Sequence, residues 1–412
     1  MTRLRIQADR VIDGCTDRPL EGPAVHIEGS RIMRLAPADA AAESEVQEVR
    51  LAGCTLLPGL IDVHAHLTFG TAGRTYEQVM REDSDDLMLV RGVRNCQLHL
   101  AAGVTTIRDC GARNRTTLSL RDAAALGLFP SPRLLVSGPP LTITGGHFWW
   151  CNGEADGVEG VQRQARWLLK QGVDFLKIMA SGGGTVGTNQ AGASYTVHEI
   201  AAAVREAHHV GKLTTAHCLA AESLANAVHA GIDQVEHINF IQPDGSRRFD
   251  QGVAETIVER HIYVSPTIQT GYRELERLSA RSNLSMREQT QLGDLKHKLD
   301  TKLDFVRRFH QMGASIVAGT DAIATFGDYA IGLELLARAG IPNMQVIQAA
   351  TRVAAEAMGV GKLVGTIEVG KEADLVAVRG DPLADIRCLS EVVMVVRAGE
   401  IVGTLNSPRS DR

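Results

Sequence analysis

The stretch Leu57-Pro58-Gly59-Leu60-Ile61-Asp62-Val63-His64-Ala65-His66 decides the fold of this 412-residue chain. Its Pro58-Gly59 pair is typical of a turn, and the apolar residues that follow are typical of a buried strand. Side chains two positions apart on a strand point to the same side, so His64 and His66 would face one point where this strand ends. Two histidines on a strand are often only surface residues, but neutral imidazoles at the end of a core strand are well placed to bind a metal ion.

From residue 58 to residue 360 the sequence alternates between strand-like and helix-like segments. The first strand begins at Leu60, and the expected later strands are 104–109, 134–137, 175–179, 213–217, 234–237, 263–266 and 315–319. The expected helices are 93–102, 116–126, 158–171, 197–209, 222–230, 252–259 and 295–312, and several end at a glycine, as helix C-termini often do. Eight strands connected by helices predict a (β/α)₈ TIM barrel, an α/β fold.

Both ends of the chain have a different pattern, that of short strands without helices. We expect strands at 4–8, 24–28 and 31–35, then at 373–378 and 392–397, followed by a hairpin turn at Ala398-Gly399-Glu400. The two ends are therefore expected to form one small β-sandwich domain from residues 1–57 and 361–412, beside the barrel of residues 58–360.

Composition limits the classes of function. The chain is 44% apolar and only 4% aromatic, so aliphatic side chains must fill the core, and its net charge of −5 comes without a basic block, so we expect no nucleic-acid partner. No stretch is apolar and long enough to cross a membrane, and residues 1–6 lack the apolar run of a signal peptide. The seven scattered cysteines are expected to be reduced and mostly buried, which indicates a cytoplasmic protein.

The polar residues that end the predicted strands indicate where the chemistry lies, because TIM barrels carry their active sites at the C-terminal ends of the strands. Those residues are His64, His66, Asp109, His147, Lys177, His217, His237 and Asp321. Polar side chains gather at such ends in any barrel, but this does not explain why imidazoles end the first, fifth and sixth strands.

Lys177 is unusual because Leu176 and Ile178 flank it in a core strand, where a charged lysine is costly to bury. It could form a structural ion pair, a Schiff base, or a carbamate with CO₂. A carbamate is a bidentate anion that can bridge two metal ions. Beside four histidines and an aspartate, this third interpretation accounts for the most residues.

These motifs resemble those of the amidohydrolase superfamily, and the resemblance covers nearly the whole chain. The matching pieces are 58–66, Lys177, His217, His237, Ala318-Gly319-Thr320-Asp321 and 370–376. Residues 176–183 and Gly145-Gly146-His147 are similar to the binuclear-zinc branch that includes Xaa-Pro dipeptidases, carboxypeptidase-like dipeptidases and ochratoxinase. That branch tends to place a tyrosine directly after Pro-Thr-x-x-Thr, whereas here Gly271 precedes Tyr272.

The resemblance implies a centre with two divalent metal ions, most simply zinc. It assigns one ion to His64, His66 and Asp321, the other to His217 and His237, and the bridge between them to carbamylated Lys177. It also implies a hydrolase that cleaves an amide C–N bond of a dipeptide-like or N-acyl amino acid substrate through a hydroxide that bridges the metals. Asp321 would act as the acid–base residue, and the protein would be a homo-oligomer.

Residues near this centre are expected to bind the substrate. His147 is placed to hydrogen-bond the substrate's carbonyl oxygen or a carboxylate, or else only to pack. Trp149 and Trp150 would line an apolar part of the substrate pocket, or pack their own loop. Tyr272 and Arg273 would help to bind a carboxylate.

Other features are expected to support the site. The glycine-rich segment 181–192 lacks the Gly-Lys-Ser/Thr of a phosphate loop, so we expect a flexible loop over the site. Asp62 and Asp109 are expected to hold the ligands in place rather than to bind metal.

Two other functions compete with this one. Cyclic-amide hydrolases and deaminases of the same superfamily, such as relatives resembling imidazolonepropionase, usually use one metal, no bridging lysine and, in many cases, a Glu close after the fifth-strand histidine. Here Glu222 stands five residues after His217 and is expected to begin a helix. A non-enzymatic scaffold would have lost metal ligands, and this chain lacks none.

Overall fold

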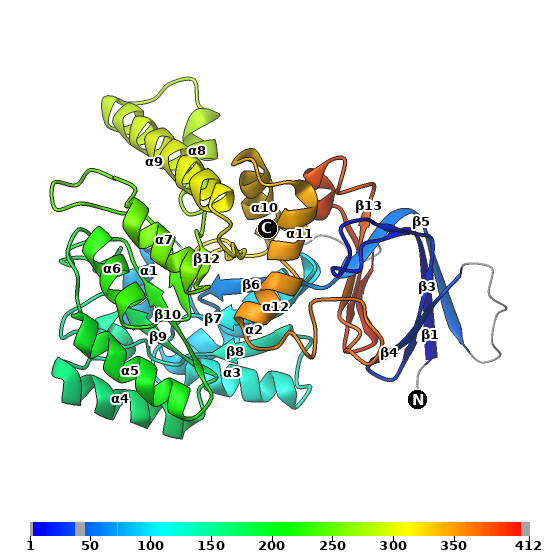
Figure 1. Ribbon diagram of the computed structural model, residues 1–412, viewed down its shortest axis with the longest axis horizontal. Coiled ribbons are helices and arrows are strands. Elements are labelled where there is room, and N and C mark those ends of the chain that lie inside the picture. The colour runs from blue at the N-terminus through cyan, green and yellow to red at the C-terminus, as the bar shows by residue number, and fades with distance from the viewer. Residues whose placement is uncertain (1–2, 38–45, 72, 405–412) are drawn as a thin grey trace.

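The computed structural model describes residues 3–37, 46–71 and 73–404. It has two parts, a barrel surrounded by helices and, on one side of it, a curved sheet that contains both ends of the described chain (Figure 1). This confirms the predicted fold class, a TIM barrel with a small β-sandwich built from the two terminal segments. The residue limits of the two domains stay a prediction.

Seven parallel strands form most of the barrel wall. They are β6 (Leu60–Ala65), β7 (Val104–Asp109), β8 (Arg133–Val136), β9 (Phe175–Met179), β10 (Leu213–His217), β11 (Gln234–Glu236) and β12 (Tyr263–Ser265). They pair in the orders β6-β7-β8 and β9-β10-β11-β12. Beyond β8, the backbone N–H of Leu141 donates to the carbonyl of Lys177 at 2.8 Å, which joins the two groups of strands.

The eighth position of the barrel is irregular, which corrects the strand predicted at 315–319. The backbone N–H of Val317 donates to the carbonyl of Val264 in β12 at 2.9 Å, so the segment still completes the wall. On its other side the segment pairs with β6, where the N–H of Asp321 donates to the His64 carbonyl at 2.7 Å and Ala322 bridges Ala65. Asp321 itself has a left-handed φ of 55°, which aspartate tolerates better than most residues.

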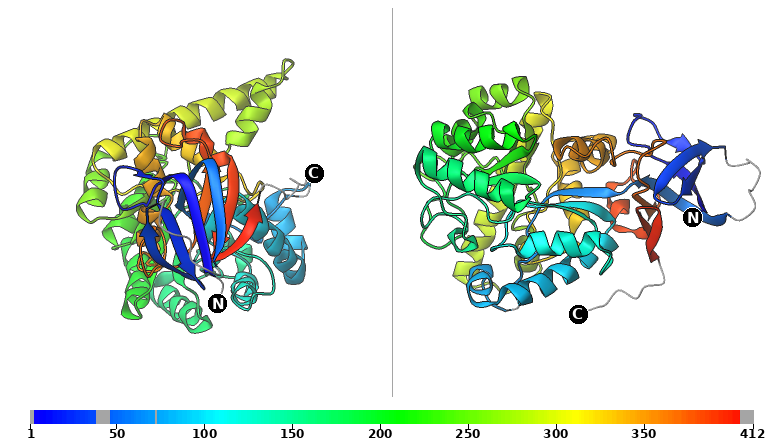
Figure 2. Two further views of the ribbon diagram at one scale, coloured as in Figure 1. Left: turned by 90° about the vertical axis from the view of Figure 1, so that its right-hand side faces the viewer. Right: turned by 90° about the horizontal axis from the view of Figure 1, so that it is seen from below.

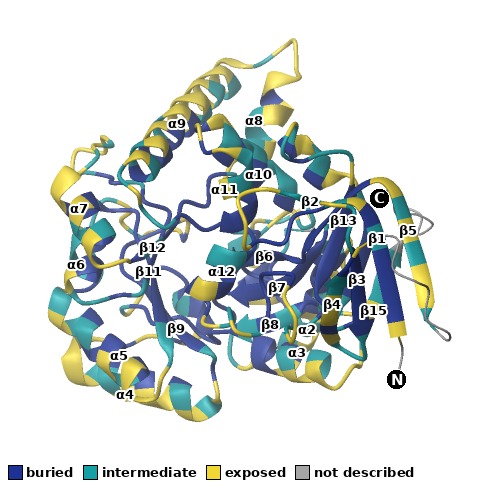
Figure 3. Ribbon diagram, turned by 45° about the vertical axis from the view of Figure 1, so that its right-hand side comes forward, coloured by how far each residue is buried: buried dark blue, intermediate teal, exposed yellow. Residues whose placement is uncertain are grey.

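Twelve helices are described, and most lie outside the barrel. They are α1 (Tyr76–Glu82), α2 (Asp85–Ala101), α3 (Thr116–Ala125), α4 (Gly157–Gln171), α5 (Val197–His209), α6 (Ala221–His229), α7 (Gln251–Glu259), α8 (Tyr272–Ser279), α9 (Met286–Gln311), α10 (Tyr329–Arg338), α11 (Asn343–Ala349) and α12 (Arg352–Ala357), with short 3₁₀ helices η1 (Trp149–Cys151) and η2 (Ile386–Ser390). Their buried faces pack on the strands and their outer faces are exposed (Figure 3). α1, α8 and α10 to α12 were not predicted.

The terminal segments form one eight-stranded sheet. Its strands are β1 (Arg3–Val11), β2 (Leu20–Glu21), β3 (Ala24–Glu28), β4 (Arg31–Ala36), β5 (Gln47–Pro58), β13 (Leu375–Arg379), β14 (Val392–Arg397) and β15 (Glu400–Thr404). The order is β15-β14-β13-β5-β1-β3-β4, with β2 paired to β1 (Figure 2). Ile27 of β3 and Met394 of β14 belong to the same buried cluster, so the sheet folds over one core, as in a sandwich. The predicted hairpin turn between β14 and β15 is confirmed.

Pro58-Gly59 does not form the predicted turn. Pro58 is the last residue of β5 and Leu60 the first of β6, so only Gly59 separates the sheet from the barrel. A methyl group at Gly59 would overlap the side chain of Thr105 in β7. The glycine is therefore required here by the close approach of a neighbouring strand rather than by a reversal of the chain.

The prediction that most of the cysteines are buried is confirmed. All seven cysteines are free, and five of them (Cys54, Cys96, Cys110, Cys151 and Cys218) are buried. Among the described residues, no helix is both long and apolar enough to cross a membrane.

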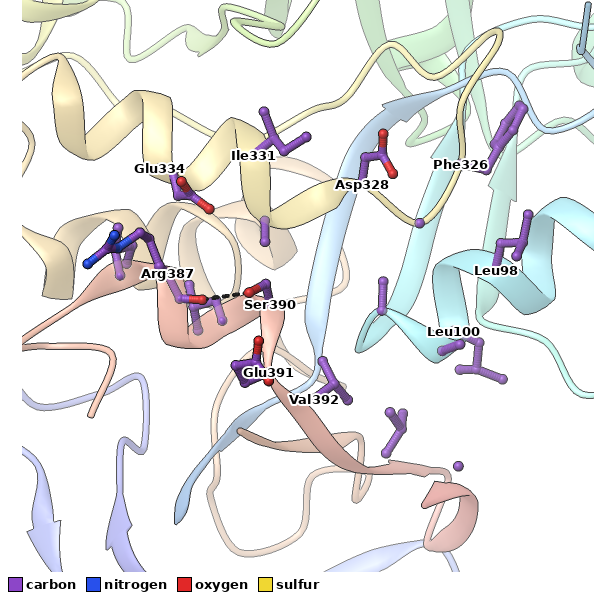
Figure 4. A pocket seen from close by; sticks show the side chains of 18 of the residues that line it. Leu98, Leu100, Phe326, Asp328, Ile331, Glu334, Arg387, Ser390, Glu391 and Val392 are labelled. Carbon is purple, nitrogen blue, oxygen red and sulfur yellow. Dashed lines mark hydrogen bonds between the residues drawn. The ribbon is translucent and has the colours of Figure 1, made fainter. Parts of the chain in front are cut away.

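A broad cleft lies where the barrel meets the small sheet (Figure 4). It is lined by Ile331 and Glu334 of α10, by Arg387 of η2, which lies beside Glu334, and by Val392 of β14. This cleft holds none of the residues that the sequence predicts as metal ligands.

Candidate metal centre

A cavity of ≈ 300 Å³ opens at the C-terminal ends of the barrel strands. All six residues predicted as metal ligands line it: His64, His66, Lys177, His217, His237 and Asp321. The barrel therefore brings together side chains that are more than 250 residues apart in the sequence.

The two histidines of β6 converge on Asp321. Oδ1 of Asp321 lies 3.4 Å from Nε2 of His64 and 3.4 Å from Nε2 of His66. The ligand atoms of these three residues all lie within 4.8 Å of one another, so one ion could contact all three. The alternation of side chains along a strand places both imidazoles on the same side, as predicted.

A second pair of imidazoles lies beside the first. The ring centroids of His217 and His237 are 4.5 Å apart, and those of His64 and His237 are 5.2 Å apart. Lys177 is 1% exposed, and its Nζ lies 3.4 Å from Nε2 of His64. The lysine, on β9, thus shares the cavity with histidines from β6, β10 and the end of β11.

One nitrogen of each imidazole is already held by the protein. The contacts are His64 Nδ1 to Glu236 Oε2 (2.8 Å), His66 Nδ1 to the Gly111 carbonyl (3.0 Å), His217 Nε2 to the Gly182 carbonyl (3.1 Å) and His237 Nδ1 to Thr267 Oγ1 (2.7 Å). This fixes each ring and leaves its other nitrogen for a ligand in the cavity.

The electrostatic environment favours metal-binding protonation states. Burial lowers the pKa of His64 to about 4 and that of His217 to about 3, and nearby Lys177 contributes in both cases, so the rings are neutral and keep a lone pair. Burial alone would raise the pKa of Asp321, but His64 and His66 lower it below its ordinary value, so the carboxylate is ionised. Neutral imidazoles with an ionised carboxylate fit a divalent cation such as zinc.

Glu236 and Arg108 were missed by the sequence analysis. Glu236 is fully buried, and besides holding His64 it accepts hydrogen bonds from Arg108 Nη2 (3.0 Å) and Thr215 Oγ1 (2.6 Å). Burial opposes its ionisation, but His64, Lys177 and Arg108 lower its pKa below the ordinary value. The sequence could have pointed to Glu236 in the same way as to Lys177, because each is a charged residue inside a predicted core strand.

The carboxylates of Asp62 and Asp109 accept hydrogen bonds from backbone N–H groups and do not line the cavity, as predicted. Oδ1 of Asp62 accepts from the backbone N–H groups of His64 and Thr320, both at 3.0 Å. Oδ2 of Asp109 accepts from the N–H of Leu67 at 2.7 Å. The two carboxylates thus fix the strand ends that carry the ligands.

His147 lies in the cavity wall next to His217, with 4.7 Å between the ring centroids. Its Nδ1 lies 2.8 Å from Oγ1 of Thr185, which also accepts from the N–H of Phe148 at 3.1 Å. When Nδ1 accepts the hydroxyl proton of Thr185, Nε2 carries the ring proton and can donate it to a substrate atom.

The glycine-rich segment 181–192 packs against the site and is held by its own hydrogen bonds. Gly182 N–H donates to the Asn189 carbonyl at 3.1 Å, and Gln190 Nε2 donates to the Gly183 carbonyl at 3.0 Å. A side chain at Gly183 would collide with the ring of His147. The segment is thus more tightly bound than the flexible loop expected from its composition.

Trp149 and Trp150 do not line the cavity, which corrects that part of the prediction. Phe148 takes a left-handed conformation with φ of 61° and points into the cavity in their place. Trp150 packs in an apolar cluster with Phe69, and Trp149 lies under the guanidinium of Arg81.

Tyr272 lines the cavity, but Arg273 does not, which corrects a second prediction. Arg273 instead lines the broad cleft between the barrel and the small sheet, and its guanidinium pairs with Asp328 at 2.7 Å and with Glu276 at 2.9 Å. These two ion pairs hold the Arg273 side chain away from the cavity that Tyr272 lines.

Comparison with known proteins gives consistent matches. The model of the Amidohydrolase family matches residues 55–402. Ochratoxinase from Aspergillus niger is 27% identical over 370 residues, which cover 82% of this chain and 72% of that protein.

Two solved structures match almost the full length. A Xaa-Pro dipeptidase with methionine bound in its active site superposes with a TM-score of 0.84 at 26% identity, covering 97% of this chain and 99% of that one. A prolidase complexed with N-methylphosphonate-L-proline superposes with a TM-score of 0.85 at 26% identity, covering 98% and 100% of the two chains.

Proposed function

The chain belongs to the amidohydrolase family, as its motifs predicted, and on this premise we propose that it is a binuclear metal-dependent hydrolase of an amide C–N bond. The substrate we propose is a dipeptide or an N-acyl amino acid. The relatives support this class, because a Xaa-Pro dipeptidase, a prolidase and ochratoxinase are among them.

The observation that carries the proposal is the position of Lys177. Lys177 is 1% exposed, lines the same cavity as the candidate ligands and lies 3.4 Å from Nε2 of His64, where an ammonium is costly to bury and would repel a cation. A carbamate formed with CO₂ would supply the anion that two cations can share. His64, His66 and Asp321 would hold one cation, and His217 and His237 the other.

The bound ions would lower the pKa of a water molecule and polarise the scissile carbonyl. The protein's own residues would move the proton. Asp321 is ionised and 15% exposed, so it can accept the proton of the attacking water and deliver it to the leaving nitrogen. His147 can donate from Nε2 to the carbonyl oxygen of the substrate as negative charge develops there.

The deaminase alternative finds no support in the position of Glu222. This residue lies in the first turn of α6, is exposed and does not line the cavity. It therefore cannot act on a substrate nitrogen at the metal centre.

A hydrolysis screen tests the proposal. Metal-loaded protein is incubated with Xaa-Pro and Xaa-Arg dipeptides, N-acyl amino acids, aromatic amides and a cyclic amide, and the released amine is measured. Cleavage of dipeptides or N-acyl amino acids that stops when a chelator removes the metal supports it. Cleavage confined to the cyclic amide, or release of ammonia from an aminated heterocycle, would replace it with the alternative.

A further inference from the structure

One wall of the cavity is lined by cations. Arg247, Lys298 and Lys302 all line it, whereas Asp321 is the sole carboxylate among the described lining residues. Asp321 is already engaged by the imidazoles of His64 and His66. Among the described lining residues, the three cations therefore outnumber the single carboxylate, which leaves an excess of positive charge.

Two separate elements of the fold bring these three cations to the same cavity. Lys298 and Lys302 are four residues apart on α9, and so lie on one helical face together with Leu295 and Leu299, which also line the cavity. Arg247 comes from the other side, on a hairpin after β11 in which it pairs with Ile241 through the backbone. Two elements distant in sequence therefore present positive charge to the same space.

These cations have no carboxylate partner within ion-pair distance among the described residues. Burial lowers the pKa of Arg247, and no neighbouring charge counteracts it. Lys302 is 9% exposed, and its Nζ donates to the Thr267 carbonyl at 3.1 Å. By contrast, Arg248, next in sequence to Arg247, is exposed and lies 3.5 Å from Asp244. Lys302 is buried, Arg247 is half-buried and Lys298 is exposed. The positive charges of Lys302 and Arg247 are therefore costly to bury unless a ligand supplies an anion.

The opposite wall has a different character. Tyr76 of α1, Phe148 and Ile323 line it, and all three belong to one apolar cluster. The ring centroids of Phe148 and His66 are 5.1 Å apart, whereas His237 and Lys302 both hydrogen-bond Thr267, at 2.7 and 3.1 Å. The candidate ligands therefore have the apolar cluster beside His66 and a cation beside His237. A substrate across this centre would have an apolar group on one side of its scissile bond and an anionic group on the other.

We propose that Arg247, Lys298 and Lys302 form an anion subsite for a dicarboxylic leaving group, so that the preferred substrates are N-acylated or peptidyl glutamate and aspartate. One carboxylate can satisfy the guanidinium of Arg247 through two hydrogen bonds. Lys302, which is buried and, among the described residues, bonded only to a carbonyl, and the exposed Lys298 four residues before it can then bind a second carboxylate. This inference rests on the proposed function and specifies its substrate.

The test is a series of substrates with one apolar acyl group, phenylacetyl, on L-glutamate, L-leucine, L-leucinamide and L-lysine. The glutamate compound should have a kcat/KM at least about 10-fold above the leucine compound, since a hydrogen-bonded charge is worth about 10- to 100-fold. The leucinamide and lysine compounds should be slower still. Equal rates for glutamate and leucine would overturn the inference and leave the proposed function intact, whereas no cleavage of any compound or of the dipeptide screen would overturn both.

Variants assign the effect to the residues. Arg247→Gln should raise KM for the glutamate compound by about 10- to 100-fold and remove most of the preference over the leucine compound. Lys298→Gln, at the exposed end of the wall, should reduce the preference in the same direction. Arg248→Gln is the matched control and should leave the preference unchanged. Metal content and thermal unfolding of each variant show that it is folded, and an undiminished preference in folded Arg247→Gln would overturn the assignment.

Discussion

Nζ of Lys177 lies 3.4 Å from Nε2 of His64, and both side chains are about 1% exposed. Because Nδ1 of His64 is held by the ionised Glu236, Nε2 is the nitrogen with the free lone pair. A lysine ammonium would take that lone pair and would repel a cation. A metal ion and an unmodified Lys177 therefore compete for the same place, whereas a carbamate would remove the conflict.

Asp321→Asn should lose most turnover and keep much of its metal. An amide oxygen can still contact an ion weakly, but it cannot accept and deliver a proton. The expected fall in kcat is about 10²–10⁴-fold, the usual contribution of a general acid–base group. Turnover and metal content are measured on the same preparation, and a variant with near wild-type kcat would reduce Asp321 to a ligand alone.

His147→Ala should lower kcat/KM by about 10²–10³-fold, as the loss of one donor to a developing oxyanion does. The loss should be equal for an N-acyl amino acid and for its neutral amide, because both have the same scissile carbonyl. The comparison of these two substrates on wild type and variant is the measurement. A loss confined to the KM of the acid would assign His147 to the carboxylate, and no loss would leave it a packing residue.

Most of the fold, and the convergence of the six candidate ligands on one cavity, was predictable because both follow from local patterns. The alternation of apolar strands and helices located β7, β9 and β10 at their observed bounds, and a histidine that ends a core strand of a barrel must face its mouth. The position of Lys177 followed from the cost of a charge in a core strand.

The substrate-binding residues could not be predicted in this way because they lie on loops and helices. Whether Trp149 or Phe148 faces the cavity depends on a single left-handed residue, φ of 61° at Phe148. Arg273 and Arg247 look alike in sequence, and only the packing of α8 and of the hairpin after β11 shows which one reaches the cavity. Which of these side chains faces the cavity is determined by tertiary contacts, and such contacts leave no periodic signal in the sequence.

Glu236→Gln should weaken both the fold and the metal site. The glutamine leaves the buried Arg108 without its counter-charge, and breaking a buried pair costs about 3–5 kcal/mol. Loss of the carboxylate behind His64 should also lower metal affinity by about 10- to 100-fold. Denaturant unfolding and chelator competition measure the two effects.

Glu274→Gln is the matched control, because Glu274 pairs with Arg277 on the exposed surface of α8. That change should cost no more than about 1 kcal/mol. If Glu236→Gln behaved like this control in both assays, the buried pair would not position His64.

His99→Leu should change the pH dependence of stability. His99 is fully buried against Phe326 without a hydrogen-bond partner among the described residues, and burial lowers its pKa from 6.5 to about 4. In the unfolded chain His99 is protonated below about pH 6.5, whereas in the folded chain it stays neutral down to about pH 4. Protonation therefore favours the unfolded state, and the free energy of unfolding falls as the pH drops from about 6.5 to about 4. We compare the free energy of unfolding of the variant with that of wild type at each pH. The variant's value relative to wild type should be up to about 3 kcal/mol higher at pH 4 than at pH 8. Parallel stability curves for the two proteins would show that His99 does not titrate in this way.

The number of divalent ions per chain in wild type and in Lys177→Ala tests the central claim most directly. Protein prepared with zinc and bicarbonate is analysed by metal mass spectrometry, with turnover measured on the same sample. The account predicts about two ions per wild-type chain, at most one per Lys177→Ala chain with turnover lost, and partial recovery of both when a short carboxylic acid is added to the variant. A folded Lys177→Ala protein that keeps the wild-type metal content and turnover would contradict it.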